Sequence, residues 1–212
     1  MAGSRAEKRE RILDAAIKTF AKKGFHQSRV TDIAQEAGVA DGTIYLYFKN
    51  KDDILISIFE EKMAVIVARM RAQLDPIDDP REKLHQFIDF HLSQMERQRN
   101  LAEIFQVELR LSHKFMKEYV PIRLSEYLDL LASIVKEGQD QGLFRDDVTP
   151  AVIKRVIFGA MDELALNWVL TRGRRWDLRR NAAELSGVFL RGLLTEPESW
   201  IPPKVNLTSK AT

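Results

Sequence analysis

The stretch TDIAQEAGVADGTIYLYFKN, residues 31–50, decides the fold of the N-terminal part of the chain. It predicts a helix, a tight turn at Gly38 and a short second helix that begins near Asp41. The outward side of the second helix carries small residues, hydroxyls and phenols, and lysines follow it at once. This composition is typical of a helix that enters the major groove of DNA while phenols and lysines hold phosphates. The inward positions of the pair are apolar: Ile33, Ala34, Ala37, Val39, Ile44 and Phe48.

Residues 8–60 resemble the DNA-binding domain of TetR-family regulators. A plain three-helix subdomain with a glycine turn is the alternative, and it leaves the exposed phenols without a role. The matching elements are the entry helix Arg11 to Lys23, Gly24-Phe25, Thr31-x-Ile33-Ala34, Ala37-Gly38-Val39, Gly42-Thr43-Ile44-Tyr45, Tyr47-Phe48 and Lys49-x-Lys51-x-x-Ile54-Leu55.

The resemblance implies a role for each DNA-contacting residue. Phosphate contacts are expected from Thr31, Tyr45, Tyr47 and Lys51, close approach to DNA from Ala40 and Gly42, base contacts from Asp41 and Thr43, and a phosphate or groove-edge contact from Arg29.

Three of these assignments have a structural alternative that the sequence leaves open. Tyr45 or Tyr47 is either a phosphate contact or a packed ring. Asp41 is either a base contact or only a helix cap, since a carboxylate near phosphates is unfavourable. Arg29 is either a DNA contact or a solvated charge.

Composition places the chain among globular proteins. Of its 212 residues, 45% are hydrophobic and 30% are charged. No apolar run approaches the roughly 18 residues that would span a membrane, and no apolar signal core follows the basic N-terminus. We therefore expect a cytoplasmic protein with no membrane partner. The absence of cysteine excludes disulfides, thiol catalysis and thiolate metal sites.

Charge is distributed unevenly along the chain. Residues 1–51 hold ten Lys and Arg against six Asp and Glu, whereas the remaining residues hold 23 against 25. A basic head on a mildly acidic body suits a protein that presents one end to a polyanion, although an excess this small is weak evidence alone.

Helical periodicity predicts an all-α fold of about nine helices. We expect a three-helix DNA-binding head at residues 1–51, a larger helical effector-binding and dimerisation body at 52–195, and an irregular tail at 196–212. Pro121 is expected to kink or split a helix over residues 113–141. Capping residues predict where further helices begin. They are Ser28, Asn50, Asp79, Thr149 and Asp177.

No catalytic arrangement is visible in the sequence. The four histidines are scattered, and the chain contains no HExxH, GxSxG, P-loop or GxGxxG pattern. We therefore expect a protein that is not an enzyme, with no metal site and no cofactor.

Ten bulky, flexible side chains form either plain core or the lining of an apolar pocket. They are Phe87, Met95, Phe105, Leu109, Phe115, Met116, Tyr119, Tyr127, Phe158 and Met161. Three stretches resemble FadR-type members of the TetR family: residues 39–63, residues 106–112, and residues 157–163 with Trp168. Such proteins repress fatty-acid degradation genes, and long-chain acyl-CoA relieves the repression. The resemblance implies a long-chain acyl-CoA effector. The expected ligand-binding residues are Phe105, Gln106, Leu109, Arg110, Met116, Tyr119, Tyr127, Phe158 and Met161.

A basic mouth is needed for the phosphates of CoA, and Arg110 is the first candidate, with Gln106 one turn before it and Arg123 a weaker choice. Arg110 is otherwise a buried partner of Glu108 or Glu163. The arginines at 172–180 either bind phosphate, lie at a dimer surface or are solvated.

The full expectation is a homodimeric repressor that binds a palindromic double-stranded operator and leaves it when its effector binds. The resemblance implies dimerisation through the helices near 150–171 and 177–194, whose small residues permit close packing. A TetR-type regulator with another hydrophobic effector, a drug or a free fatty acid, is the alternative.

Overall fold

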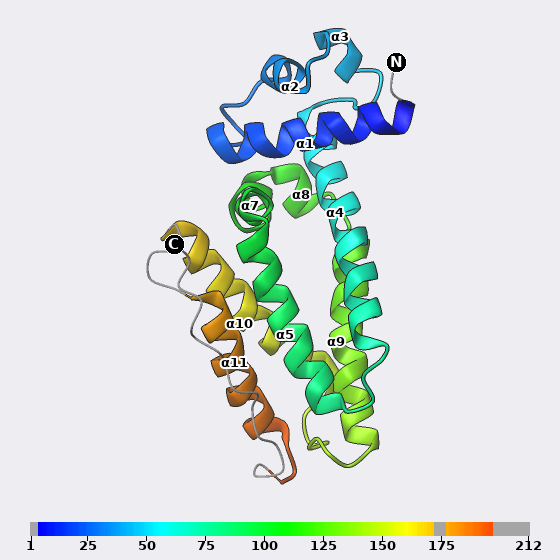
Figure 1. The fold of residues 1–212 in the computed structure, drawn as a ribbon, viewed down its shortest axis with the longest axis vertical. Helices are drawn as coiled ribbons and strands as arrows, with labels where there is room; N and C mark the ends of the chain where they lie inside the picture. Colours follow the sequence, from blue (N-terminus) through cyan, green and yellow to red (C-terminus); the bar gives the residue numbers. More distant parts are fainter. Residues whose placement is uncertain (1–3, 172–176, 197–212) are drawn as a thin grey trace. The chain divides into compact units, whose positions relative to one another are not determined.

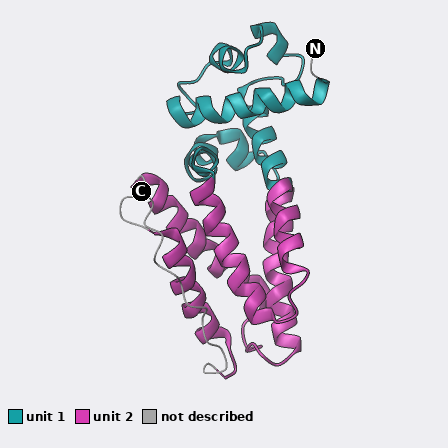
Figure 2. Ribbon diagram, viewed as in Figure 1, with its two compact units in different colours: residues 1–64, 98–121 teal, residues 65–97, 122–212 magenta. Residues whose placement is uncertain are grey.

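The structure is a computed structural model that describes residues 4–171 and 177–196. It is all-α, as predicted, and no β-strand occurs among these residues apart from one isolated bridge between Phe144 and Leu194. The chain forms two compact units (Figures 1 and 2). Unit 1 holds residues 1–64 and 98–121, and unit 2 holds residues 65–97 and 122–212. Unit 1 thus contains the expected DNA-binding segment 1–51, the first part of α4 and a later helical segment.

Three helices and the start of a fourth make up the N-terminal part of unit 1: α1 (Arg5–Lys23), α2 (Val30–Ala37), α3 (Asp41–Ile44) and α4 (Lys51–Leu74). Ser4 and Glu7 form a capping box at the start of α1. Asn50 accepts the Asp53 N–H at 2.9 Å, so the predicted cap of α4 is confirmed. The shared core is formed by apolar residues that are all buried: Ile12, Ala16, Phe20, Ile33, Ala34, Ile44, Phe48 and Ile54.

The second segment of unit 1 is a helical run whose geometry changes along its length. It comprises α6 (Arg99–Glu103), the π-helical turn η1 (Ile104–Glu108), α7 (Leu109–Leu111) and α8 (His113–Lys117). Sequence periodicity cannot distinguish a π turn from an α turn, and such turns are frequent at functional sites. Pro121 separates α8 from the next helix, so the predicted split is confirmed.

Unit 2 consists of the end of α4 together with α5 (Pro80–Arg97), α9 (Ile122–Asp140), α10 (Pro150–Leu170) and α11 (Leu178–Leu193). The starts of these helices follow the predicted signals, because Asp79 and Asp177 accept N–H bonds of the first turn and Thr149 is the N-cap before Pro150. Helix α5 packs against α9, α10 and α11. Its buried face provides the centre of the core with Leu84, Phe87, Ile88, His91 and Leu92.

One predicted cap is wrong. Arg29, not Ser28, is the N-cap residue of α2. The buried Ser28 hydroxyl instead donates to the Gly24 carbonyl at 2.7 Å, which ties it to the end of α1. The expected tail at 197–212 and residues 172–176 lie outside the described residues.

Within the described residues, no helix has both the length and the apolar character that a bilayer crossing requires.

Candidate nucleic-acid interface and effector-binding residues

The turn between α2 and α3 orients a short exposed element. Gly38 adopts the left-handed conformation, with φ 63°, which a side chain would strain. Ala40 is the extended N-cap of α3. Although α3 ends at Ile44, helical bonds continue, since the Phe48 N–H reaches the Ile44 carbonyl at 3.0 Å. Ile44 and Phe48 are buried, so this element turns its other side to solvent.

The residues expected to contact DNA lie on this element and at the start of α2. Among the nine, six are exposed and three are half-buried. The exposed ones are Arg29, Thr31, Ala40, Asp41, Gly42 and Tyr45, and the half-buried ones are Thr43, Tyr47 and Lys51.

The structure decides between some of the alternatives that the sequence left open for Tyr45, Tyr47 and Asp41. The phenol of Tyr45 is 60% exposed, so it is not a packed ring. The ring of Tyr47 is covered in part by the guanidinium of Arg5, 5.8 Å from its centroid. Asp41 is exposed and is the first residue of α3, after the N-cap Ala40, so it is not the cap.

Lys51 differs from its expected role. Its ammonium donates to the carbonyls of Phe25 at 2.6 Å, Ser28 at 3.0 Å and His26 at 3.3 Å, and lies 4.4 Å from the centroid of the Phe25 ring. An ammonium has three donors, and all three are used here. Lys51 therefore fixes the loop before α2, and in this structure it is not free to bind a phosphate.

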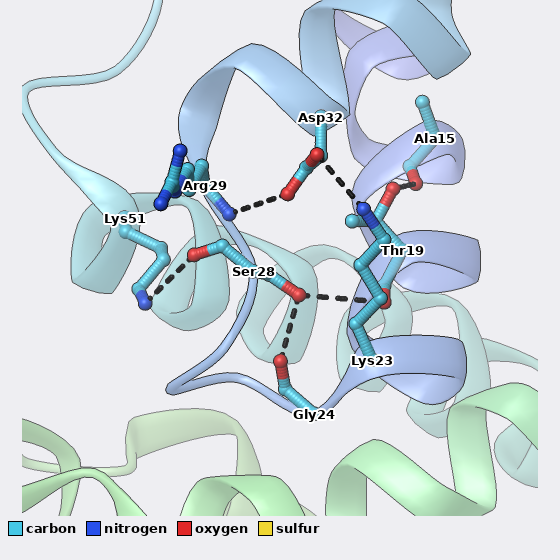
Figure 3. Close-up of polar contacts among 8 residues, drawn as sticks. All are labelled: Ala15, Thr19, Lys23, Gly24, Ser28, Arg29, Asp32 and Lys51. Carbon is cyan, nitrogen blue, oxygen red and sulfur yellow. Dashed lines mark hydrogen bonds and ion pairs between the residues drawn. The ribbon is translucent and has the colours of Figure 1, made fainter.

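A polar network holds that loop against α1 (Figure 3). Asp32 accepts the Lys23 ammonium at 2.8 Å and the Arg29 backbone N–H at 2.8 Å. The Lys23 hydrogen bond, followed by the Arg29 N–H, holds the pKa of the Asp32 carboxyl below its usual value. The Arg29 side chain makes no bond to this network, so its guanidinium is available for a phosphate.

A residue that sequence reasoning missed lies between the two phenols. Leu46 is 71% exposed. Ile44 and Phe48 on either side of Leu46 are apolar and were expected to face inward. This spacing could have predicted that Leu46 faces outward.

In unit 1, aromatic side chains gather around Phe59 of α4, and the expected ligand-binding residues Phe105 and Tyr119 are among them. The Phe105 and Phe115 rings lie 5.2 and 5.0 Å from the Phe59 ring, and the Tyr119 ring stacks on Phe115 at 5.2 Å. The Tyr119 hydroxyl is buried and has no hydrogen-bond partner among the residues that the structure describes. An apolar cluster with one unsatisfied hydroxyl is suited to an amphipathic ligand.

The other expected residues of unit 1 divide into buried and exposed ones. Gln106 and Leu109 are buried. Arg110 is exposed and donates to the Gln106 side chain at 3.0 Å, so the reading of Arg110 as a buried residue is wrong. Met116 is 55% exposed, and none of the five residues of α8 is buried. Met116 therefore does not line an enclosed pocket in this structure.

Inside unit 1, two hydrogen bonds join the same segment to the DNA-binding head and to the start of α4. The buried Glu108 carboxylate accepts the Phe25 N–H at 2.5 Å. The Ser112 hydroxyl donates to Asp52 of α4 at 3.0 Å. Sequence analysis treated Glu108 only as a partner for Arg110, and no local pattern marks a contact to a residue 83 positions away.

In unit 2, the expected residues Tyr127 and Phe158 contact the buried His91, and the expected residue Met161 is buried on α10. The Tyr127 hydroxyl lies 2.9 Å from His91 Nδ1, and the Phe158 ring meets the imidazole edge-on at 6.0 Å. Burial lowers the pKa of His91 to about 4, although the charge of Asp162 opposes this. His91 Nε2 is buried, and no hydrogen-bond partner for it occurs in the described part of the chain. The nine expected ligand residues thus divide between the two units, six in unit 1 and three in unit 2.

Of the arginine-rich loop, residues 172–176, with Arg172, Arg174 and Arg175, lie outside the described part of the chain. Arg179 and Arg180 pair with Glu96 at 3.3 Å and with Glu184 at 2.7 Å. Arg123 pairs with Glu126 at 2.8 Å.

Two family profiles match most of the chain. Residues 12–58 match the bacterial regulatory proteins of the tetR family, and residues 59–192 match the C-terminal region of YsiA-like proteins. The chain is 41% identical to the fatty acid metabolism regulator protein of Bacillus subtilis over 167 residues, which is 79% of this chain and 86% of that protein.

The chain is also similar to solved structures of fatty-acid regulators. FadR of Bacillus subtilis, in complex with stearoyl-CoA, superposes with a TM-score of 0.81 at 38% identity, covering 86% of this chain and 98% of that one. The fatty acid degradation regulator FadR of Bacillus halodurans superposes with a TM-score of 0.83 at 37% identity, covering 89% and 97%.

Proposed function

The chain belongs to the TetR family of bacterial regulatory proteins, and we propose that it is a homodimeric repressor of fatty-acid degradation genes. Its head binds a palindromic operator, and a long-chain acyl-CoA releases it. One observation carries the proposal: the chain matches a fatty acid metabolism regulator over most of both lengths, and a FadR structure that it resembles holds stearoyl-CoA. Because the operator is DNA, the protein acts in the cytoplasm.

Binding to DNA is supported by what the head exposes. Helix α3 starts with Asp41, Gly42 and Thr43 beside a turn that no bulky side chain blocks. The exposed Tyr45 hydroxyl and the free Arg29 guanidinium are suited to phosphates, which position the protein without reading sequence. The net positive charge of residues 1–51 adds attraction to the polyanion.

Binding of an acyl-CoA is supported by the chemistry of the expected residues. The ring cluster around Phe59 in unit 1 offers apolar surface for an acyl chain. Arg110 is exposed and held by Gln106, so it presents a cation at the surface for phosphate.

Coupling between the two activities is supported by the position of η1. This turn carries Phe105, which meets Phe59, and Glu108, which holds the loop of the head through the Phe25 N–H. A ligand that prefers one arrangement of Phe105 changes the position of Glu108, and it shifts DNA affinity by its differential affinity for the two states. The Ser112–Asp52 bond adds a second link, at the start of α4.

Dimerisation is supported by an exposed apolar face on α10. Val152, Val156 and Leu170 are exposed, and the helical repeat places them on one side together with Gly159. Val188 of α11 is exposed as well, and a Cβ at Gly159 or Gly187 would meet no atom within 4 Å. A second copy of the chain would bury these residues and place two recognition helices about 34–36 Å apart for a palindromic site.

The test begins with genomic fragments that the purified protein retains. The proposal predicts a shared palindrome beside genes of fatty-acid degradation. Binding isotherms on this duplex and on a scrambled duplex at fixed salt then measure specificity, and Tyr45→Phe is expected to weaken both equally, since it removes a phosphate contact. Equal affinity of the wild type for both duplexes would overturn the proposal. Turnover of acyl-CoA by the protein would point instead to an enzyme.

A further inference from the structure

The described part of the head, residues 4–51, exposes large apolar side chains at one place. They are Tyr45, at 60%, and its neighbour Leu46, at 71%. A phenol has a hydroxyl that accounts for its exposure, but leucine has none. A single exposed leucine on a protein surface needs no explanation. Here, however, it lies inside the segment that matches the DNA-binding profile, residues 12–58.

The backbone after α3 fixes the direction of Leu46. Tyr45 has helical dihedral angles, φ −70° and ψ −10°, and the Leu46 N–H reaches the Thr43 carbonyl at 3.2 Å. Leu46 therefore follows Gly42 by one helical turn, on the same side. Ile44 and Phe48 occupy the inward side and are buried.

Gly42 shows that this side is open. A Cβ at Gly42 would meet no atom of the described residues within 4 Å. An element that approaches DNA through the side of Gly42 also turns Leu46 towards the DNA. Among the base edges of the major groove, the one apolar group that distinguishes a base pair is the C5-methyl of thymine.

We propose that Leu46 reads a thymine methyl group in each half of the operator and is a specificity-determining residue of this protein. The inference rests on the proposed DNA-binding function and adds the base that one side chain selects. Leu46 makes no polar bond to DNA, so it contributes through the burial of methyl against methyl. A phosphate or sugar contact would instead make Leu46 indifferent to the base.

The test uses the operator duplex in which one thymine at a time, in both half-sites, is replaced by deoxyuridine. This change removes the C5-methyl and keeps every hydrogen bond. One buried methyl corresponds to about a fourfold change in affinity per half-site, and hence to roughly fifteenfold for a dimer. We expect wild-type affinity to fall by this amount at one position, and Leu46→Ala to bind thymine and deoxyuridine duplexes alike at that position.

Val120→Ala is the matched control, because Val120 is 72% exposed and lies outside residues 12–58. It is expected to keep the full response to deoxyuridine. Thermal unfolding checks that both variants fold, which the exposure of both side chains favours.

The results distinguish failure of the proposed DNA-binding function from failure of the proposed role of Leu46. If the wild type does not prefer the operator to scrambled DNA, the proposed function fails. If it does, but Leu46→Ala responds to deoxyuridine as the wild type does, or weakens on every duplex equally, then Leu46 does not read a methyl group and the inference is overturned.

Discussion

At the residue scale, Gly42 and Gly138 are both helical glycines with opposite surroundings. A Cβ at Gly42 meets no atom within 4 Å, whereas a Cβ at Gly138 would lie 2.1 Å from Cδ2 of the buried Phe144 ring. Gly138 is therefore required by the fold of unit 2. Packing among the described residues does not require a glycine at position 42, and the proposed close approach to DNA would explain one.

Gly42→Ala tests that explanation. In a helix, alanine is more favourable than glycine by about 0.5–1 kcal/mol, and no clash opposes it here, so stability is expected to hold or rise slightly. Operator affinity is expected to fall by about tenfold, near 1.4 kcal/mol, because the added methyl keeps the helix from the groove. Thermal unfolding and a DNA-binding isotherm on the same sample measure both effects. Unchanged affinity would place the DNA-contacting face elsewhere.

His91 makes the stability of unit 2 depend on pH. Its folded-state pKa of about 4 lies below the ordinary value of 6.5 because of burial, so the unfolded chain binds a proton more readily between these values. The free energy of unfolding is thus expected to fall as pH drops from 6.5 towards 4, by about 1.4 kcal/mol for each pKa unit of the difference.

His91→Gln provides the comparison, since glutamine keeps a hydrogen-bonding side chain next to Tyr127 and does not titrate. Urea unfolding at several pH values should show a flatter dependence for this variant over the same window. An identical slope for the two proteins would show that another group titrates there.

The sequence predicted residues whose role depends on local pattern. Gly38, Asn50, Asp177 and the outward Tyr45 all lie where turn and cap chemistry placed them. Prediction from the sequence failed for residues whose contact partners are distant in the chain. Lys51 bonds to carbonyls about 25 residues earlier, and Glu108 reaches back to Phe25, so neither contact has a sequence signal.

At the scale of elements, Gly138 allows α9 to pack against the segment that follows it. Gly138→Ala is expected to cost about 1–3 kcal/mol of stability, the range for overpacking in a core, because Phe144 is buried and has no free space. Denaturant unfolding measures the loss. The double variant Gly138→Ala, Phe144→Leu should recover part of it, and a neutral single variant would contradict the close approach.

The exposed face of α10 and α11 is where the dimer is expected to form. Val188→Arg adds a charge to a side chain that is 68% exposed in the protomer, so folding should be retained while association is lost. Sedimentation at micromolar concentration is expected to show a dimeric wild type and a monomeric variant with poor operator affinity. Val120→Arg, at 72% exposure, is the matched control and should remain dimeric. A monomeric wild type would contradict the dimer.

At the scale of the whole molecule, the helix order and the type of fold followed from periodicity, and the assignment to a family followed from the 31–50 stretch. The division of ligand residues between two compact units did not, because periodicity within a helix carries no information on which helices share a core. The π turn η1 was equally hidden, and it is the element that brings expected ligand residues and a contact to the head into one turn.

The central claim is that a long-chain acyl-CoA releases the protein from its operator. The most direct measurement is the fluorescence anisotropy of a labelled operator, bound by the protein and titrated with stearoyl-CoA, free CoA or stearate. Each buried methylene contributes about 0.8 kcal/mol, and the phosphates add an interaction with basic residues. Stearoyl-CoA is therefore expected to release the DNA at far lower concentration than either part alone, and Arg110→Glu to require more of it with unchanged affinity for free operator. Retention of the operator at saturating stearoyl-CoA, or equal release by stearate, would contradict the account.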